Sequence, residues 1–245
     1  MLRQELFEIT ENRNLARGIW RMRLRGNTAA VTAPGQFVNL RLEGHFLRRP
    51  ISVCDWEAGE LTLIYKVLGK GTEEMTRYGA GKVLDLLTGL GNGFSLAESG
   101  PAPLLIGGGV GIPPLYGLAR RLRAEGKKPT AVLGFNTAEE IFYEEEFRAL
   151  GCETLLATAD GSRGKRGFVT DILPETYSHY YTCGPEPMLR AVFRAARGAG
   201  QLSFEERMGC GFGACMGCSC ETLTGHKRIC REGPVLRKEE LLWED

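Results

Sequence analysis

The chain has 245 residues, of which 43% are hydrophobic and 25% are charged, as in an ordinary globular protein with room for two modest domains. With 31 Lys and Arg against 30 Asp and Glu, the formal net charge is only +1. Such a balance gives no basic surface of the kind that binds nucleic acid or an anionic membrane.

The first ten residues, MLRQELFEIT, carry charge and lack the apolar core of a secretory signal. The one long uncharged stretch, 99–119, contains too many glycines and prolines for a membrane helix. We therefore expect a cytoplasmic protein with neither a membrane nor a nucleic acid partner. In that compartment, clustered cysteines bind metal or do redox work more often than they form disulfides.

The first hundred residues have the pattern of β-structure. Segment 20–25 alternates apolar and basic residues, segment 37–42 places Val38, Leu40 and Leu42 on one face, and segment 61–67 is rich in β-formers. Turns that contain glycine separate these short runs. The pattern predicts a small antiparallel barrel over residues 1–98.

Strands and helices alternate after residue 98. We expect strands at 103–107, 130–135, 153–158 and 178–183, and helices at 113–126, 138–151 and 185–198. In the second helix, Ile141, Phe142 and Phe147 are candidates for the buried side. Units of this length predict a parallel sheet covered by helices over residues 99–200, an α/β domain, with residues 201–245 as a separate cysteine-rich segment.

Four of the eight cysteines lie within residues 210–220, where a disulfide knot, a zinc site and an iron–sulfur cluster are the competing interpretations. Cys210, Cys215 and Cys218 stand as C-x4-C-x2-C, and Cys230 follows, which is the spacing of plant-type [2Fe–2S] proteins. A zinc site needs two chelating pairs, and only Cys215 and Cys218 form a C-x2-C pair. The spacing favours iron–sulfur, with Cys220 as a spare thiol that points away from a shared iron.

Glycines at positions 209, 211, 213 and 217 surround these cysteines. They let a loop wrap tightly, with positive φ where needed, and leave backbone N–H groups free to point at the sulfur atoms.

Two motifs of the expected barrel are candidates for binding a flavin. In RRPISV, Arg49 can pair with a pyrophosphate and Ser52 can bond a flavin edge, although an arginine before a proline at a barrel rim is also commonly structural. In IYKVLGKGT, Lys66 adds a cation, and Gly71 and Thr72 belong to a loop whose backbone can approach phosphates.

Two loops of the expected α/β domain are candidates for binding a dinucleotide. Gly109 and Gly111 lie in IGGGVGIPP, which ends a strand and opens a helix, but Pro114 stands where a Rossmann motif has its third glycine. Cys183 and Gly184 lie in TCGPEPM, another strand end, and Cys183 can equally be a core thiol. Because both loops lie at carboxyl ends of strands, a dinucleotide could span them.

The segment after strand 130–135 bears on the choice between NAD and NADP. Residues 136–140, NTAEE, contain no Arg or Lys that could pair with a 2′-phosphate, and Glu139 and Glu140 would repel one. We expect a preference for NAD, although both glutamates can also be ordinary first-turn residues of the expected helix.

The motifs RRPIS, GKGT, GGGVGIPP, CGPEPM and ERMGCGFGACMGCSC…RICREGPV occur in this order. Together they resemble the electron transfer subunits of type B dihydroorotate dehydrogenase, within the ferredoxin–NADP reductase-like superfamily, over nearly the whole chain. The resemblance implies an FAD-binding barrel, an NAD-binding domain, a C-terminal [2Fe–2S] loop and a heterotetramer, two plus two, with an FMN-containing catalytic subunit.

Carried onto this sequence, the resemblance implies FAD contacts at Arg49, Pro50, Ile51, Ser52, Ile64, Tyr65, Lys66, Gly71 and Thr72. It implies cluster ligands at Cys210, Cys215, Cys218 and Cys230. Electrons from dihydroorotate would pass from the partner's FMN through the cluster and FAD to NAD+, in pyrimidine synthesis. The alternatives are a flavin and iron–sulfur subunit of an NADH-dependent ferredoxin:NADP oxidoreductase or of a hydrogenase complex, and a zinc-containing interaction module without enzymatic activity.

Overall fold

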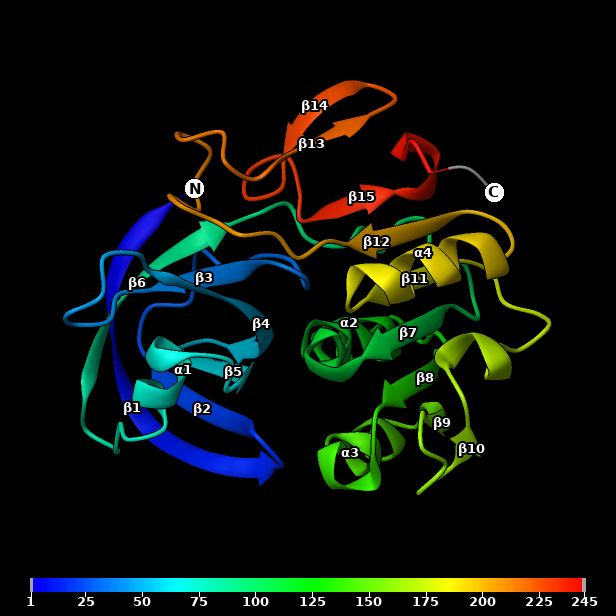
Figure 1. Ribbon diagram of the computed structural model, residues 1–245, viewed down its shortest axis with the longest axis horizontal. Coiled ribbons are helices and arrows are strands. Elements are labelled where there is room, and N and C mark those ends of the chain that lie inside the picture. The colour runs from blue at the N-terminus through cyan, green and yellow to red at the C-terminus, as the bar shows by residue number, and fades with distance from the viewer. Residues whose placement is uncertain (1, 244–245) are drawn as a thin grey trace.

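The computed structural model describes residues 2–243, which form a barrel, an α/β sheet and a C-terminal segment that lies over both (Figure 1). Six antiparallel strands close the barrel in the order β1-β2-β5-β4-β3-β6. They are β1 (Arg3–Ala16), β2 (Ile19–Arg25), β3 (Phe37–Leu40), β4 (Arg49–Glu57), β5 (Glu60–Lys66) and β6 (Val83–Leu90), with the short helix α1 (Lys70–Met75) between β5 and β6. The expected barrel is confirmed.

Alternation of side chains builds the barrel core. Met22 and Leu24 of β2, and Val38 and Leu40 of β3, are at most 1% exposed, and Leu42 just beyond β3 is also buried. These positions lie two apart, so they share the inner face of their strands. The apolar face expected at 37–42 is therefore correct.

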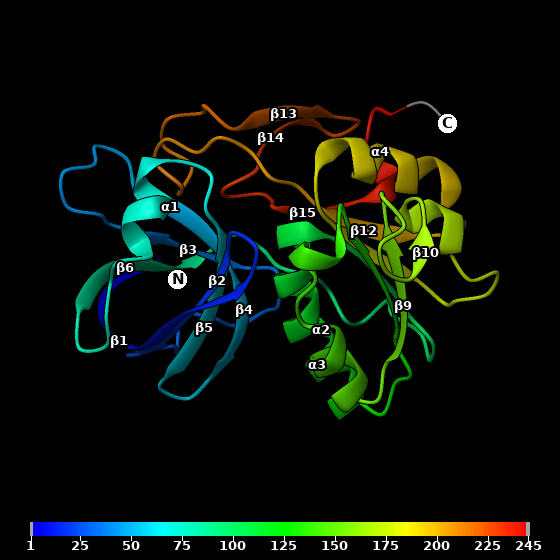
Figure 2. The same ribbon diagram turned by 60° about the horizontal axis from the view of Figure 1, so that its bottom comes forward.

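The second sheet has seven strands in the order β10-β9-β8-β7-β11-β12-β15, and all neighbours are parallel except β12 and β15. Its strands are β7 (Leu104–Gly108), β8 (Thr130–Phe135), β9 (Glu153–Thr158), β10 (Lys165–Arg166), β11 (Tyr180–Cys183), β12 (Gly200–Ser203) and β15 (Val235–Arg237). The helices are α2 (Ile112–Ala124), α3 (Glu144–Ala149) and α4 (Glu186–Ala195). Figure 2 shows this sheet edge-on beside the barrel.

Helices cover both faces of this sheet. Leu105, Ala131 and Leu133 share a core with α2 and α3, whereas Leu104, Ile106 and Val132 share a different core with α4. Consecutive residues of β7 and β8 thus point to opposite, equally buried faces, which is typical of a parallel sheet between helix layers.

The helix expected over 138–151 is wrong in its first half. Only Glu144–Ala149 is α-helical, after a 3-10 turn at Ala138–Glu140 and a left-handed residue, Tyr143, with φ of 64°. The break lets Phe142 and Tyr143 both be buried, because the Tyr143 ring packs edge-on against Tyr116 with centroids 4.9 Å apart. Phe142 and Phe147 are buried as expected, and Ile141 is half-buried.

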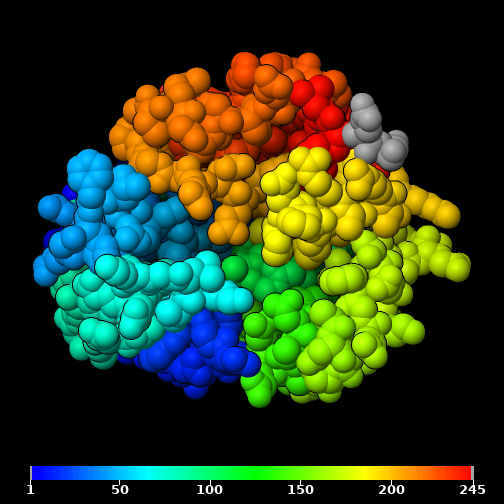
Figure 3. Space-filling view, viewed as in Figure 1, coloured from blue at the N-terminus to red at the C-terminus, as the bar shows by residue number. Residues whose placement is uncertain are grey.

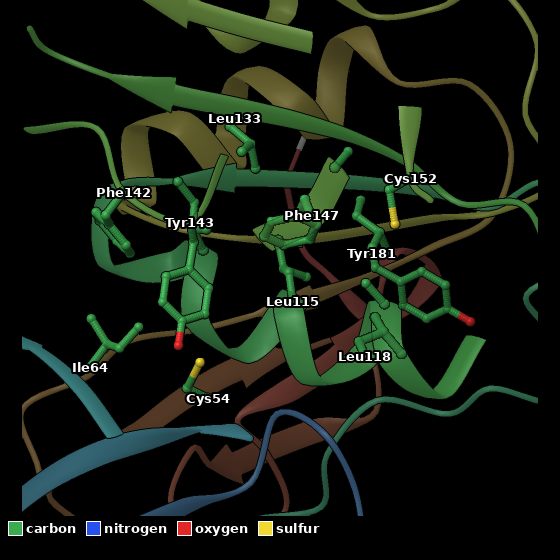
Figure 4. Packing of buried hydrophobic residues seen from close by; sticks show 14 of the residues in the cluster. Cys54, Ile64, Leu115, Leu118, Leu133, Phe142, Tyr143, Phe147, Cys152 and Tyr181 are labelled. Atoms are coloured by element: carbon green, nitrogen blue, oxygen red, sulfur yellow. The ribbon is translucent and has the colours of Figure 1, made fainter. Parts of the chain in front are cut away.

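Tyr143 also joins the two halves of the molecule. Its hydroxyl points at the thiol of Cys54 in β4 (Figure 4), and the same hydroxyl interacts with Arg21 of β2. Arg21 in turn donates two hydrogen bonds to Glu11, at 2.9 and 2.7 Å. The helix break and the left-handed Tyr143 therefore accompany an ordered, buried contact between sheet and barrel.

The C-terminal segment bridges barrel and sheet and lies across both in the space-filling view (Figure 3). It adds β12 and β15 to the sheet and forms a hairpin of β13 (Ser219–Thr222) and β14 (Gly225–Arg228). The Asn92 side chain, just after β6, donates to Val235 at 2.7 Å and accepts from the Val235 N–H at 3.1 Å. Over the described residues, no helix is both long and apolar enough to cross a membrane.

Candidate functional site

The four cysteines with ferredoxin-like spacing form two facing pairs. The thiols of Cys210 and Cys215 interact, and the Cys215 N–H donates to Cys210 Sγ at 3.5 Å. Cys218 and Cys230 form the second pair, in which the Cys230 N–H donates to Cys218 Sγ at 3.4 Å. The loop therefore brings Cys230 from beyond the β13–β14 hairpin back to the residues of the C-x4-C-x2-C run.

Two pairs are the donor set that a binuclear cluster needs, because each of its two irons takes two thiolates. A zinc site would gather four ligands around one ion. Among residues 2–243, no three Cys, His, Asp or Glu side chains are grouped in that way. The two thiol pairs match the four-thiolate set of a [2Fe–2S] cluster.

Backbone N–H groups surround the first pair, as the glycine pattern predicts. Ala214 N–H donates to Cys210 Sγ at 3.2 Å. Burial opposes ionisation of Cys210, but N–H groups of residues 212, 215 and 214 stabilise its thiolate and lower its pKa to about 6. Burial, and then its contact with Cys218, raises the pKa of Cys230 to about 12. A metal that binds Cys230 must therefore displace its proton.

Arg228 fastens the cluster loop, residues 205–220, to the rest of the segment. Its Nη1 donates to the Gly213 carbonyl at 2.7 Å, and its Nε donates to Glu232 at 2.9 Å. Gly213 has φ of 93°, and a Cβ there would lie 2.6 Å from the side chain of Arg231. Only glycine satisfies both the left-handed backbone and this close approach.

Cys220 lies outside the two pairs. It is half-buried on β13, in register with Lys227 of β14, and burial is the main reason that its pKa is raised. Cys220 nevertheless packs against the core cluster that contains Cys218 and Cys230, and the nearby Cys218 also contributes to raising its pKa.

The flavin motifs come together at one rim of the barrel. Arg49–Ser52 begin β4 and Ile64–Lys66 end β5. The Arg49 guanidinium lies directly over Gly71, where any Cβ would overlap it. Thr72 Oγ1 accepts N–H bonds from Leu68 at 2.9 Å and Gly69 at 3.2 Å, which closes the loop. A cation over a glycine-rich loop is a suitable arrangement for a pyrophosphate.

The three β5 residues are placed differently from one another. Tyr65 is 1% exposed, its hydroxyl donates to Asn12 inside the barrel at 3.1 Å, and burial raises its pKa to about 12. Ile64 packs in the core between barrel and sheet. Lys66 Nζ lies 3.8 Å from a carboxylate oxygen of Glu140. Tyr65 thus offers a ligand only its backbone, whereas Lys66 offers a charge.

The two nucleotide loops touch. Strands β7 and β11 are neighbours, so the loops after them meet at the same sheet edge. A Cβ at Gly111 would overlap the carbonyl of Cys183, and one at Gly184 would lie 3.2 Å from the Gly108 nitrogen. Gly109 has φ of 52° in the 3-10 turn that opens α2. Cys183 is half-buried, and burial raises its pKa to about 12, so it remains a thiol.

One polar residue near the site is absent from the sequence expectations. Asn39 is 1% exposed although it lies on the side of β3 opposite the barrel core, and its Nδ2 donates to the Cys210 carbonyl at 3.2 Å. Phe37, on the same side, packs with Cys218 and Cys230. A polar residue within the apolar run FVNL was the available signal, but only the fold shows that the cluster loop covers it.

Comparison with known proteins supports this geometry. Residues 205–242 match the iron–sulfur cluster binding domain of dihydroorotate dehydrogenase B, and residues 105–194 match the oxidoreductase NAD-binding domain. The dihydroorotate dehydrogenase B (NAD(+)) electron transfer subunit of Geobacillus sp. strain WCH70 is 43% identical, over 99% of this chain and 100% of that protein. The subunit of the same name from Fusobacterium nucleatum is 41% identical, over 93% and 94%.

Solved structures share the fold. A chain in the structure of an NADH-dependent reduced ferredoxin-NADP oxidoreductase aligns with a TM-score of 0.86 and 30% identity, covering 97% of this chain and 90% of that chain. The ferredoxin reductase of carbazole 1,9a-dioxygenase aligns with a TM-score of 0.70 and 24% identity, covering 79% and 64%, a likeness of fold alone.

Fold and site together define a flavin- and nicotinamide-nucleotide-dependent reductase that carries an iron–sulfur segment at its C-terminal end. Within that class, the chain belongs to the family of dihydroorotate dehydrogenase B electron transfer subunits.

Proposed function

We propose that this chain carries electrons from the FMN of a dihydroorotate dehydrogenase catalytic subunit to NAD+, in the cytoplasm and as part of a two-plus-two heterotetramer. The observation that carries the proposal is the two thiol pairs held against β3, which pairs with the Arg49–Ser52 end of β4. They occur in a chain more than 40% identical to named electron transfer subunits. This arrangement supports single-electron entry at the C-terminal segment and hydride exit at the sheet.

Each part of the chain has one task in this proposal. Cys210, Cys215, Cys218 and Cys230 would hold a [2Fe–2S] cluster. Arg49–Ser52, Ile64–Lys66, Gly71 and Thr72 would hold FAD, with Arg49 at the pyrophosphate. When bound, these groups supply one-electron transfer and its conversion into hydride transfer to NAD+. The chain itself orients them, and its N–H groups around Cys210 favour the thiolate form.

The nucleotide site would be formed by Gly109, Gly111, Cys183 and Gly184, where the two loops meet. Gly109 and Gly111 lead into the N-terminus of α2, and the N–H groups at a helix N-terminus favour an anion such as a pyrophosphate. The carboxylates of Glu139 and Glu140 lie beside the end of β8, and we propose that they favour NAD over NADP.

The matching observation for a role in a ferredoxin:NADP oxidoreductase is weaker, because identity to that structure is 30% against 43% for the dihydroorotate family. Co-expression with an FMN-containing dihydroorotate dehydrogenase subunit tests the proposal. We expect a brown complex of two plus two chains, with FAD, FMN and iron, that reduces NAD+ with dihydroorotate. A chain that holds zinc without flavin, or a complex that reduces NAD+ only with reduced ferredoxin, would contradict it.

A further inference from the structure

A buried amide links the cluster loop to β3, the strand that pairs with the proposed FAD motif of β4. Asn39 lies in β3, directly opposite Pro50 of β4, and its side chain donates to the Cys210 carbonyl at 3.2 Å. Gly211, which has φ of 78°, packs so closely on this amide that any Cβ there would overlap it. Asn39 therefore touches a proposed cluster ligand on one side and the proposed FAD motif on the other.

Simple packing does not account for an asparagine at this position. Asn39 is 1% exposed, and its Oδ1 has no hydrogen-bond partner within the described part of the chain. A buried acceptor without a partner costs roughly 1–3 kcal/mol, and an apolar side chain at this position would avoid that cost. The neighbouring outward residue, Phe37, shows that the cluster segment readily accepts an apolar side chain from β3.

We propose that Asn39 is a positioning residue that fixes the Cys210–Cys215 side of the cluster loop against β3, beside the proposed FAD motif of β4. The inference rests on the proposed function and adds no chemical step: one electron still passes between cluster and flavin at a time. The amide holds the Cys210 backbone, and through it the orientation of the Cys210 sulfur and its shielding from water. Hydrogen bonding and solvent exposure around cluster sulfurs set both potential and spectrum.

Two substitutions separate the amide from the volume of the side chain. Asn39→Leu removes the donor, whereas Asn39→Gln keeps an amide that can reach the Cys210 carbonyl. The control is Asn27→Leu, at an exposed position in the β2–β3 connection, where the amide donates to Glu5 at 2.9 Å and accepts the Ala29 N–H at 3.1 Å. Asn27 comes shortly after Arg25, the last residue of β2. The other end of β2, at Ile19, pairs with Lys66 of the proposed FAD site, so Asn27 lies at the end of β2 away from that site.

The measurements use the full-length chain loaded with FAD and iron. They are iron and flavin content, the electron paramagnetic resonance spectrum of the reduced cluster, the rate at which NADH reduces the cluster, and NADH diaphorase activity with an artificial acceptor. For Asn39→Leu we expect an altered cluster spectrum and cluster reduction that is about 10-fold slower, with diaphorase activity within about twofold of the wild type. Asn39→Gln should restore both readouts toward the wild type, and Asn27→Leu should change neither.

Three results would overturn the inference. One is an Asn39→Leu chain with the wild-type cluster spectrum and reduction rate. Another is a parallel fall of diaphorase activity, which would mean that the barrel is damaged. The third is loss of iron from both Asn39 variants, which would mean that side-chain volume, and not the amide, is the important property. Loss of iron from Asn39→Leu alone, together with a native cluster spectrum in Asn39→Gln, would support the inference. A wild-type chain without FAD or cluster would instead contradict the proposed function.

Discussion

The nucleotide loops and the cluster loop are both rich in glycine, but they are held in different ways. The nucleotide loops are extensions of neighbouring strands, and Gly111 packs directly on the Cys183 backbone. The cluster loop exposes Cys215, Phe212 at 42% and Met216 at 54%, and Met216 has φ of 60°. Parallel-sheet hydrogen bonds thus fix one pair of loops, whereas thiol pairs and a few anchors fix the other.

This difference predicts how each site depends on its ligand. Backbone packing in the sheet maintains the nucleotide loops whether or not a dinucleotide is present. In the cluster loop, the strained Met216 and the exposed apolar side chains have no comparable support, so metal binding would contribute much of the local stability. Damage at the cluster should therefore leave the nucleotide site working.

The largest expected effect comes from removing a proposed cluster ligand. In Cys218→Ser, dihydroorotate-dependent NAD+ reduction by the assembled complex should fall by at least about 100-fold, because no other one-electron carrier connects the flavins. NADH diaphorase activity needs only FAD and the nucleotide site and should keep at least about half of its value. Steady-state assays of both activities, after gel filtration has verified assembly, provide the check.

Cys220→Ser is the matched control for that experiment, because it removes a thiol from the same loop but outside both pairs. It should retain iron and the coupled reaction. Iron loss in Cys220→Ser, or normal coupled activity in an assembled, cluster-free Cys218→Ser complex, would contradict the assignment of the ligands and of the relay.

The complementary change damages the nucleotide site and spares the cluster. Gly111→Ala forces a methyl group against the Cys183 carbonyl. Overpacking of this kind displaces the backbone of one loop. We expect a loss of about 1.4 kcal/mol of NADH binding, which raises the KM for NADH by about 10-fold. Gly79→Ala, at a position with no neighbour within 4 Å and no positive φ, is the control. If Gly111→Ala lost iron as readily as activity, the two sites would not be independent.

Local patterns predicted the parts of the fold that depend on local periodicity. Alternation in 37–42 and the apolar stripe of 113–126 correspond to β3 and α2. Helix 138–151 was wrong because burial of Tyr143 between Tyr116 and Cys54 favours a left-handed residue there, and both partners are distant in sequence. Propensity alone contains no information about such contacts.

In the candidate site, too, the sequence predicted local features but not contacts between distant segments. Cysteine spacing predicts Cys210, Cys215, Cys218 and Cys230 as a ligand set, which stays a prediction. The spacing did not predict that Cys218 faces Cys230, which returns from beyond the β13–β14 hairpin. It could not predict Asn39, which is 171 residues away from Cys210 and meets it only when the C-terminal segment folds over β3. Nor could it show that the side chain of Tyr65 points into the barrel, away from any ligand at its rim.

The preference for NAD over NADP tests the nucleotide site, which the parallel sheet holds in place. Glu139 pairs with Arg17 at 3.1 Å, and Glu140 accepts from the Asn136 amide at 2.9 Å, so both carboxylates have polar partners beside β8. We expect kcat/KM for NADH to exceed that for NADPH by at least about 10-fold. Glu139→Arg should narrow this ratio, whereas Glu8→Arg, an exposed carboxylate on the barrel, should not. Equal use of both nucleotides by the wild type would refute the preference.

The smallest expected effect concerns the anchor of the cluster loop. Arg228 binds both the Gly213 carbonyl and Glu232, and its guanidinium, against the weaker opposing effect of burial, lowers the pKa of Glu232 to about 2. A carboxyl group whose pKa is lower in the folded chain stabilises the fold above its unfolded pKa, near 4.5. That contribution is lost as the pH falls from there toward 2.

Glu232→Gln should therefore lower the thermal unfolding midpoint at pH 7, and the difference from the wild type should shrink as the pH approaches 2. The effect should be modest and weaken with salt, because both side chains are partly exposed. Glu8→Gln is the control for removal of an exposed carboxylate. Melting curves of the cluster-free chain from pH 7 to pH 2.5 isolate the ion pair from acid attack on the cluster. A pH-independent difference would show that Glu232 supports the loop by packing rather than by its charge.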